Sequence, residues 1–521
     1  MEFGVQSDSI APRKTDLKSR ARIMNSINRR EMLKWGAACG LAPLIDVAGD
    51  AQRAIAAESP AAIPAPSKQR VQTRMFWTWD HSTEWALNRP GAHTVGSCND
   101  YGRSKEAFVE DYTALLRWCG RHQVDAVVVW GLLRDCHGGL ESAKRLCDVA
   151  TQEKVRLLCG VGLNAYGGVY YEGNSPYNLE GHLQRHPELY AVDAQGNSTN
   201  FSIDSIGTRV SISNTTTPGP RGFYHACPSR KENQDFAAES LKWLFQNLEL
   251  GGVQIETGDT GVCQCALCRD RRKHPSSAFS WEDMALMYPI ATDAVRSVAP
   301  DAWVVCETYS HPEPYAGPNA APDFGDGKAA WADESLDRFP RGVFVQWVAD
   351  RYMRQNDPAR TWTAAGRVSG EGLRHVMRAH FGTDWGWGAF RGEVALEWIS
   401  KMVQQSVASG FDSISLFGEV SPFHTGAELN YLALADFGSP ENPTADLASF
   451  EQRIGGPLLG GVDQAQDFIR FARLLDSRFP GDRQQIPAAL TSIYSRLPTL
   501  PADAARRWCW LANQLASYAP M

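Results

Sequence analysis

Residues 253–268, VQIETGDTGVCQCALC, bring two carboxylates and three thiols together in one short stretch. An apolar run ends on Glu256, and Asp259 follows three residues later. A carboxyl group at the end of a buried strand is a candidate for acid–base chemistry, whereas closely spaced cysteines favour a metal ion or a disulfide. The stretch therefore predicts a catalytic strand end, a metal-binding loop, or both.

Acidic residues also end other apolar runs of the chain. Asp80 follows RMFWTW, Glu307 follows AWVVC, and Glu419 follows DSISLFG. Carboxyl groups that converge on one rim suit glycoside hydrolysis, in which a protonated carboxyl donates to the leaving oxygen and an ionised one attacks or stabilises the sugar cation. We therefore predict that Glu256 is the acid/base, and that Glu419 or Glu307 is the nucleophile or stabilising carboxylate. The alternative role for each acid is a salt bridge or a helix cap.

Polar and aromatic residues near the same run ends are predicted to line a substrate site. The chain has 17 Trp residues, and flat aromatic walls suit sugars, which carry one apolar face and many hydroxyls. Core packing is the alternative role for these rings. The predicted substrate-binding residues are Asp80, Asn164, Tyr166, Asp259, Trp347 and Arg391.

The cysteines of this region form a second candidate site. Cys263, Cys265 and Cys268 are spaced C-x-C-x-x-C, and Cys227 lies upstream in YHACPSR. Four thiolates at these positions could hold a structural zinc ion. One or two disulfides, such as Cys227 with Cys265 or Cys268, are the competing interpretation. Either arrangement would staple the loop that follows Glu256.

The elements that must position these residues alternate regularly along the chain. Eight apolar runs are strand-like: 74–79, 125–130, 155–163, 251–256, 302–307, 342–347, 387–392 and 412–418. Apolar residues recur with helical spacing between most of them: 105–119, 139–152, 233–248, 281–298, 371–378 and 394–409. The alternation predicts an α/β fold, a (β/α)8 barrel over residues 71–430. A long insertion follows the third strand, from 164 to about 230, and residues 431–521 form a helical C-terminal extension.

Residues 1–57 are typical of an export signal. Arg29 and Arg30 precede a mild apolar run, and an Ala-x-Ala-like end lies near residues 54–57. This resembles a twin-arginine signal, which implies the twin-arginine translocase as partner and a periplasmic or extracellular bacterial location. Met24 has the spacing of a normal start, so residues 1–23 could precede the true start. Residues 58–70 would be a linker, and we expect no integral membrane anchor.

Two passages resemble a known group of barrels. HPELYAVDAQGN and GVQIETGDTGVCQCALCRD resemble segments of glycoside-hydrolase-like barrels of exported bacterial proteins, loosely of the family-20 hexosaminidase and α-glucuronidase superfamily type. The resemblance covers roughly residues 71–430 and implies a carbohydrate substrate. The hexosaminidase pattern has adjacent Asp and Glu residues, whereas Glu256 and Asp259 stand three apart. The resemblance therefore does not imply substrate-assisted hydrolysis of an N-acetyl sugar by this chain.

Three functions follow from these observations. The first is an exported glycoside hydrolase that acts on a polysaccharide or oligosaccharide and requires no cofactor for catalysis. The second is a non-catalytic carbohydrate-binding barrel. The third is a metal-dependent hydrolase, although the chain has no H-E-x-x-H motif and its first strand ends on Asp80-His81. A formal net charge of −7 gives no sign of a nucleic-acid partner.

Overall fold

The computed structural model describes residues 70–80, 83, 85, 104–201, 223–257, 261–273, 280–308, 334–348, 372–379, 393–408, 410–475 and 480–518. The chain divides into two compact units, residues 1–63 and 64–521. All described residues belong to the second unit. The predicted signal region therefore lies outside the described residues.

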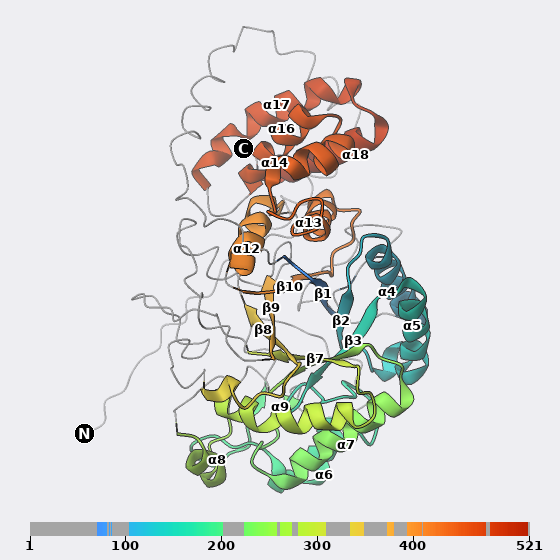
Figure 1. Ribbon diagram of the computed structural model, residues 1–521. Coiled ribbons are helices and arrows are strands. Elements are labelled where there is room, and N and C mark those ends of the chain that lie inside the picture. The colour runs from blue at the N-terminus through green and yellow to red at the C-terminus, as the bar shows by residue number, and fades with distance from the viewer. Residues whose placement is uncertain are drawn as a thin grey trace, which may run out of the picture. The chain divides into compact units, whose positions relative to one another are not determined.

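Eight parallel strands close into a barrel in the order β1-β10-β9-β8-β7-β6-β3-β2 (Figure 1). They are β1 Thr73–Trp79, β2 Ala126–Trp130, β3 Arg156–Gly162, β6 Gly252–Glu256, β7 Trp303–Glu307, β8 Phe344–Val348, β9 Arg374–Ala379 and β10 Ser413–Phe417. Helices follow most strands and cover the outside of the ring, as Figure 1 shows. The predicted (β/α)8 fold class is confirmed.

The strands are buried on both faces, which explains their long apolar runs. On β6, Val253 and Ile255 pack in the layer between strands and helices. Gln254, between them, faces the barrel interior, where its side chain bonds to Trp130 of β2 and Glu307 of β7. Polar side chains therefore enter this barrel on the inner face of otherwise apolar strands.

The helices of the barrel lie over the outer face of the strands, and most of them are amphipathic, whereas the last is buried on nearly all sides. They are α4 Lys105–Arg121, α5 Gly139–Glu153, α7 Lys231–Asn247, α9 Trp281–Arg296, α12 Leu396–Ala408 and α13 Thr425–Asp436. Helix α4 packs beside α5, and α7 packs beside α9 (Figure 1). Helix α4 begins where Ser104 Oγ accepts a hydrogen bond from Ala107 N, at 3.2 Å.

The segment between β3 and α7 carries its own small elements. It contains α6 Leu179–Arg185 and a two-stranded antiparallel sheet of β4 Asn200–Phe201 and β5 Phe223–Tyr224. A second short helix, α8 Ala266–Arg271, lies in the connection between β6 and α9. These two connections follow the carboxyl ends of neighbouring strands and border the candidate site.

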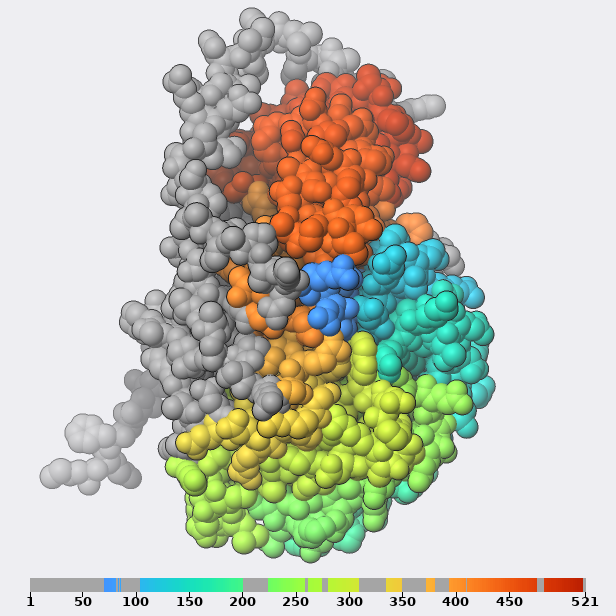
Figure 2. Space-filling model, in the orientation of Figure 1, coloured from blue at the N-terminus to red at the C-terminus, as the bar shows by residue number. Residues whose placement is uncertain are grey.

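Helices beyond α13 gather into a compact group of their own, drawn in orange to red in Figure 2. They are α14 Leu447–Phe450, α15 Gly456–Leu459, α16 Val462–Ala472, α17 Ile486–Arg496 and α18 Ala502–Tyr518. Trp508 is fully buried among them and donates its indole N–H to Leu459 O at 3.0 Å. Arg507 on α18 donates two hydrogen bonds to the Glu428 carboxylate on α13, at 2.8 and 2.6 Å.

The seventh strand differs from the sequence prediction. Residues 371–378 were expected to be helical and residues 387–392 to form the strand, yet β9 is Arg374–Ala379. Val376 faces the barrel interior, and Met377 faces the helices. The strand contains two arginines and a histidine, so it lacks the apolar composition by which the other strands were recognised. Residues 387–392 lie outside the described residues.

Candidate active site

A layer of polar side chains crosses the barrel interior near its carboxyl end. Glu307 Oε2 accepts hydrogen bonds from Gln254 Nε2 at 3.2 Å and from Gln346 Nε2 at 2.5 Å. The same oxygen lies 3.4 Å from Arg378 Nη2. Glu307 Oε1 accepts from the backbone N–H of Thr308 at 3.1 Å. The layer thus links β6, β7, β8 and β9 around one buried carboxylate, whose negative charge Arg378 stabilises.

Glu256 ends β6 beside this layer. Ile255 pairs with Cys306 in the parallel ladder between β6 and β7, so the next step of the register sets Glu256 beside Glu307. Gln254 faces the interior, and side chains alternate along a strand, so Glu256 faces the interior as well. Neighbouring strands lie about 4.8 Å apart. The register therefore brings two carboxylates side by side at the carboxyl end of the barrel.

A cluster of aromatic rings fills the adjacent part of the barrel. The ring centroid of Trp79 lies 5.4 Å from that of Trp130, 5.7 Å from that of Tyr171 and 6.2 Å from that of Tyr166. Gly160 makes room for this cluster, because a Cβ there would lie 2.5 Å from the Trp130 ring. Burial raises the pKa of Tyr171, which therefore stays neutral. The predicted residue Tyr166 belongs to this cluster.

Glu419 stands on the other side of the barrel mouth. It follows β10, which lies four strands from β6 in the ring. Its Oε1 accepts a hydrogen bond from the backbone N–H of Trp79 at 2.9 Å, which ties the end of β10 to the end of β1. Glu256, Glu307 and Glu419 are 2, 0 and 1% exposed.

Asp80 lies in a buried ion-pair network. Its Oδ2 is 2.5 Å from Arg134 Nε and 3.2 Å from His137 Nε2. Arg134 also pairs with Glu172 and stacks over the Tyr171 ring at 4.2 Å. Burial lowers the pKa of His137. Burial also raises the pKa of Glu172, although the positive charge of Arg134 partly offsets this rise. Asp80 therefore holds Arg134 in place, which corresponds to the salt-bridge alternative of the sequence analysis.

Asn164 borders a small hollow beside β6. The hollow has room for about one water molecule and is lined in part by Asn164, His225, Thr257 and Cys263. Asn164 O accepts a hydrogen bond from Ala226 N at 2.8 Å, while Asn164 Oδ1 has no hydrogen-bond partner within the described part of the chain. Burial lowers the pKa of His225 to about 4, so this ring is neutral at pH 7.

Of the remaining predicted substrate-binding residues, the structure describes only Trp347, which points away from the barrel interior. Trp347 lies in the layer between strands and helices, where its Nε1 donates to His375 Nδ1 at 3.1 Å and its ring packs 5.8 Å from Trp281. The even positions of β8 face inward, as Gln346 does, so Trp347 faces outward and we leave it out of the candidate site. Asp259 and Arg391 lie outside the described residues.

Two interior residues, Gln254 and Arg378, were missed by the sequence analysis. Gln254 is a polar residue in the middle of GVQIE, and period-two counting back from the strand end at Glu256 would have found it. Arg378 was missed because its strand was predicted to be a helix.

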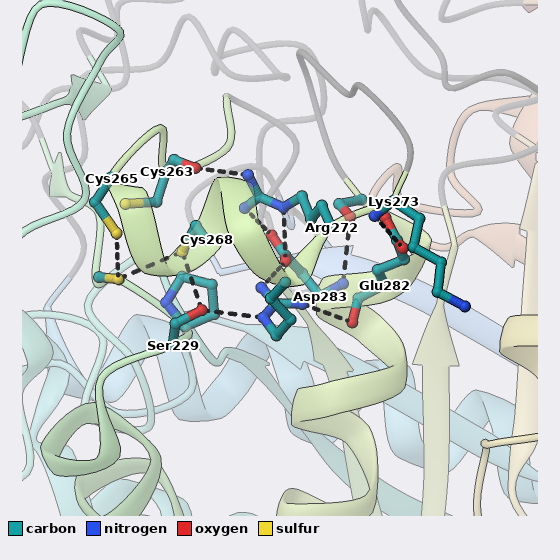
Figure 3. A network of polar contacts seen from close by, with 12 residues as sticks. Ser229, Cys263, Cys265, Cys268, Arg272, Lys273, Glu282 and Asp283 are labelled. Atoms are coloured by element: carbon teal, nitrogen blue, oxygen red, sulfur yellow. Dashed lines mark hydrogen bonds and ion pairs between the residues drawn. The ribbon is translucent and has the colours of Figure 1, made fainter.

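The four predicted metal-ligating cysteines converge (Figure 3). Within the described residues, Cys227, Cys263, Cys265 and Cys268 are the group of His, Cys, Asp and Glu side chains whose ligand atoms could hold one metal ion. Hydrogen bonds from Cys227 and Cys263 lower the pKa of the Cys268 thiol, and contacts with Cys263 and Cys268 raise the pKa of Cys227. The described histidines form no comparable group.

Comparison with known proteins gives structural similarity only. No family model matches the chain, and no curated protein matches it. It is similar to a glycoside hydrolase family 20 β-N-acetylglucosaminidase, with 12% identity, 77% of this chain and 76% of that chain covered, and a TM-score of 0.41. It is also similar to a β-N-acetylhexosaminidase from Bacteroides fragilis NCTC 9343, with 12% identity, 70% of this chain and 65% of that chain covered, and a TM-score of 0.39.

An α-L-fucosidase isoenzyme 2 from Paenibacillus thiaminolyticus gives 12% identity, 70% of this chain and 49% of that chain covered, and a TM-score of 0.37. Such values carry no argument about the reaction, which has to rest on the residues of the barrel mouth.

None of the helices within the described ranges has the length and apolar character needed to cross a membrane.

Proposed function

We propose that this protein is a glycoside hydrolase whose catalytic carboxylates are Glu256 and Glu307. The observation that carries the proposal is the register of β6 and β7, which sets the two side chains next to each other at the carboxyl end of the barrel. In (β/α)8 enzymes this end of the barrel holds the active site. The proposal also fits the neighbouring cluster of Trp and Tyr rings, since such rings can stack on a sugar.

The surroundings of the two carboxylates suggest different roles. Glu307 lies 3.4 Å from the guanidinium of Arg378 and accepts hydrogen bonds from two glutamine amides, contacts that favour negative charge. We assign Glu307 as the ionised carboxylate that attacks or stabilises the sugar cation. Glu256 then donates the proton to the leaving oxygen and later withdraws one from water.

The close spacing makes a prediction about stereochemistry. Carboxyl groups about 5–5.5 Å apart accompany retention at the anomeric carbon, whereas inversion needs about 6.5–9.5 Å to admit a water molecule. Glu256 and Glu307 lie on adjacent strands, which favours the shorter separation. Glu419, four strands from β6, would be the second carboxylate of an inverting pair.

The test is a screen of the purified full chain against aryl-glycosides and a panel of bacterial and algal polysaccharides. Sugar release, with the first product formed in the retained configuration by NMR, supports the assignment of Glu256 and Glu307. Release with inversion contradicts Glu307 as the partner and points to Glu419. Absence of release from every member of the panel, with glycan binding retained, contradicts the hydrolase.

A non-catalytic carbohydrate-binding barrel is the second candidate. It is favoured by the saturation of Glu307, whose oxygens already take hydrogen bonds from Gln254, Gln346 and Thr308. If this carboxylate serves only to organise the barrel interior, the mouth retains Glu256 as a ligand for sugar hydroxyls. Binding that survives in Glu256→Gln without any hydrolysis by the unaltered protein supports this candidate.

We also propose that the protein is exported through the twin-arginine translocase. The support is the sequence alone, in which Arg29 and Arg30 precede a mild apolar run. Replacing both arginines by lysine should retain the protein in the cytoplasm of a bacterial host, as followed by cell fractionation. Export that is unchanged in this variant would contradict the proposal.

A further inference from the structure

The sulfur atoms of four cysteines lie at the separations that one tetrahedral ion imposes. Cys227 Sγ is 3.7 Å from Cys265 Sγ and 3.5 Å from Cys268 Sγ, and the four sulfurs all lie within 4.8 Å of one another. A zinc ion with Zn–S bonds of about 2.3 Å separates its sulfurs by about 3.8 Å. A disulfide would bring two of them to about 2.05 Å. All four thiols are free in the structure.

The chain delivers these sulfurs from two segments. Cys265 caps α8 and Cys268 follows one turn later, a spacing that puts both side chains on the same side of the helix. Cys227 precedes α7 in a turn whose carbonyl, Cys227 O, accepts hydrogen bonds from Arg230 N at 3.2 Å and from Asn233 Nδ2 at 3.0 Å. The local backbone thus positions three of the four ligands.

A backbone N–H, a hydroxyl group and the guanidinium of Arg272, which also pairs with Asp283, lie beside the cluster. Val192 N donates to Cys263 Sγ at 3.5 Å, and Ser229 Oγ lies 3.1 Å from Cys268 Sγ. Arg272 donates to Cys263 O at 2.6 Å (Figure 3). Zinc with four thiolates carries a net charge of −2, so donors to sulfur and a nearby guanidinium stabilise it. An apolar packing role for four cysteines would not require them.

We propose that Cys227, Cys263, Cys265 and Cys268 bind one structural Zn²⁺ ion. Four sulfur ligands select zinc among the common divalent ions and leave no open position for substrate. An iron–sulfur cluster is disfavoured because its own atoms hold the ligating sulfurs further apart.

The ion joins the two connections that border the barrel mouth. Cys227 follows Ala226, whose backbone N–H binds Asn164 O, and Cys263 lies in the connection that leaves Glu256. Cys263 and Asn164 also line the same small hollow. Zinc therefore fixes the loop after β3 relative to the loop after β6. This site stands independently of the proposed hydrolysis, since it involves neither Glu256 nor Glu307.

The first test is the metal content of the purified full chain, measured by plasma mass spectrometry beside a matched set of variants. We expect one zinc ion per chain in the unaltered protein and in Cys509→Ser, whose thiol is exposed and outside the cluster. Cys263→Ser and Cys268→Ser should each lose most of the zinc. Zinc at equal content in all four proteins, or iron in place of zinc, overturns the proposal.

Three further measurements on the unaltered protein keep the proposal testable if the cysteine variants do not fold. Mercurial titration should release zinc as the thiols react, and protein loaded with Co²⁺ should show sulfur-to-cobalt charge-transfer bands with tetrahedral d–d absorption. Peptide mapping without reduction should find no bond among the four cysteines. A disulfide from Cys227 to Cys265 or Cys268 in metal-free, folded protein overturns the proposal.

Discussion

Loss of the buried Arg134 side chain should destabilise the barrel strongly. Its side chain is fully buried and pairs with Asp80, also fully buried, and with Glu172, which is 9% exposed. Arg134→Met leaves two buried carboxylates without their cation, and breaking a buried pair costs about 3–5 kcal/mol. Residues 64–521 form one unit, so at roughly 2.1 cal/mol/K per residue its unfolding entropy is about 1 kcal/mol/K. The expected fall in Tm is about 3–5 °C.

The effect should depend on pH with a definite sign. Burial raises the pKa of Glu172 above its usual value, and the charge of Arg134 opposes this rise. A carboxyl group whose folded-state pKa exceeds its unfolded-state pKa loses stability as the pH rises through the folded-state value. Without Arg134 the pKa of Glu172 rises further. The loss of unfolding free energy in Arg134→Met should therefore be complete at pH 8 and should become smaller as the pH falls toward 5.

Differential scanning calorimetry at the two pH values measures this prediction. The matched control is Arg473→Met, since Arg473 forms an exposed pair with Glu397 in which both side chains are 45% exposed. That variant should change Tm by less than about 1 °C. Adding Asp80→Asn and Glu172→Gln to Arg134→Met should restore most of the lost stability. An equal deficit at both pH values, or no recovery in the triple variant, would refute the reasoning.

Three further predictions concern packing and titration. Gly160→Ala places a Cβ 2.5 Å from the Trp130 ring and should lower the free energy of unfolding by about 1–3 kcal/mol. The control Gly181→Ala in α6 makes no contact under 3.4 Å and should be neutral or stabilising. Calorimetry of both variants tests this difference. Burial lowers the pKa of His375 to about 4, so the folded state binds its proton less readily than the unfolded state, and the unfolding free energy should fall by up to about 3 kcal/mol between pH 6.5 and 4. His375→Gln should flatten that part of the urea-unfolding profile, and an unchanged slope would contradict it. Trp347→Phe should lower Tm yet leave glycan binding unchanged, because the ring packs against helices; weaker binding at equal fold content would place it back in the site.

The architecture could be predicted from the sequence because most strands are apolar runs that end at polar residues. The runs ending at Glu256 and Glu307 lie within one residue of β6 and β7. β9 was missed because Arg374, His375 and Arg378 give it the composition of a surface helix. Only the closed ring, which buries one face of β9 inside the barrel, shows why those residues form a strand.

The candidate site could be predicted only in part. The carboxylates could be predicted because each is the first polar residue after an apolar run, which is visible in the local sequence. Which face a residue occupies depends on the register with neighbouring strands, and this sends Trp347 outward and Gln346 inward. The partner of Asp80 also required the fold, because Arg134 reaches it across 54 residues of chain.

The most direct test of the account compares sugar release by the unaltered protein with release by three matched variants. Glu256→Gln and Glu307→Gln remove the proposed catalytic carboxylates, and Glu397→Gln makes the same change at an exposed position on α12. On a glycoside that the unaltered protein cleaves, kcat should fall by about 10²–10⁴ in the first two variants and should be unchanged in the third. Full activity in Glu256→Gln, with the fold verified by circular dichroism, would contradict the proposed catalytic pair.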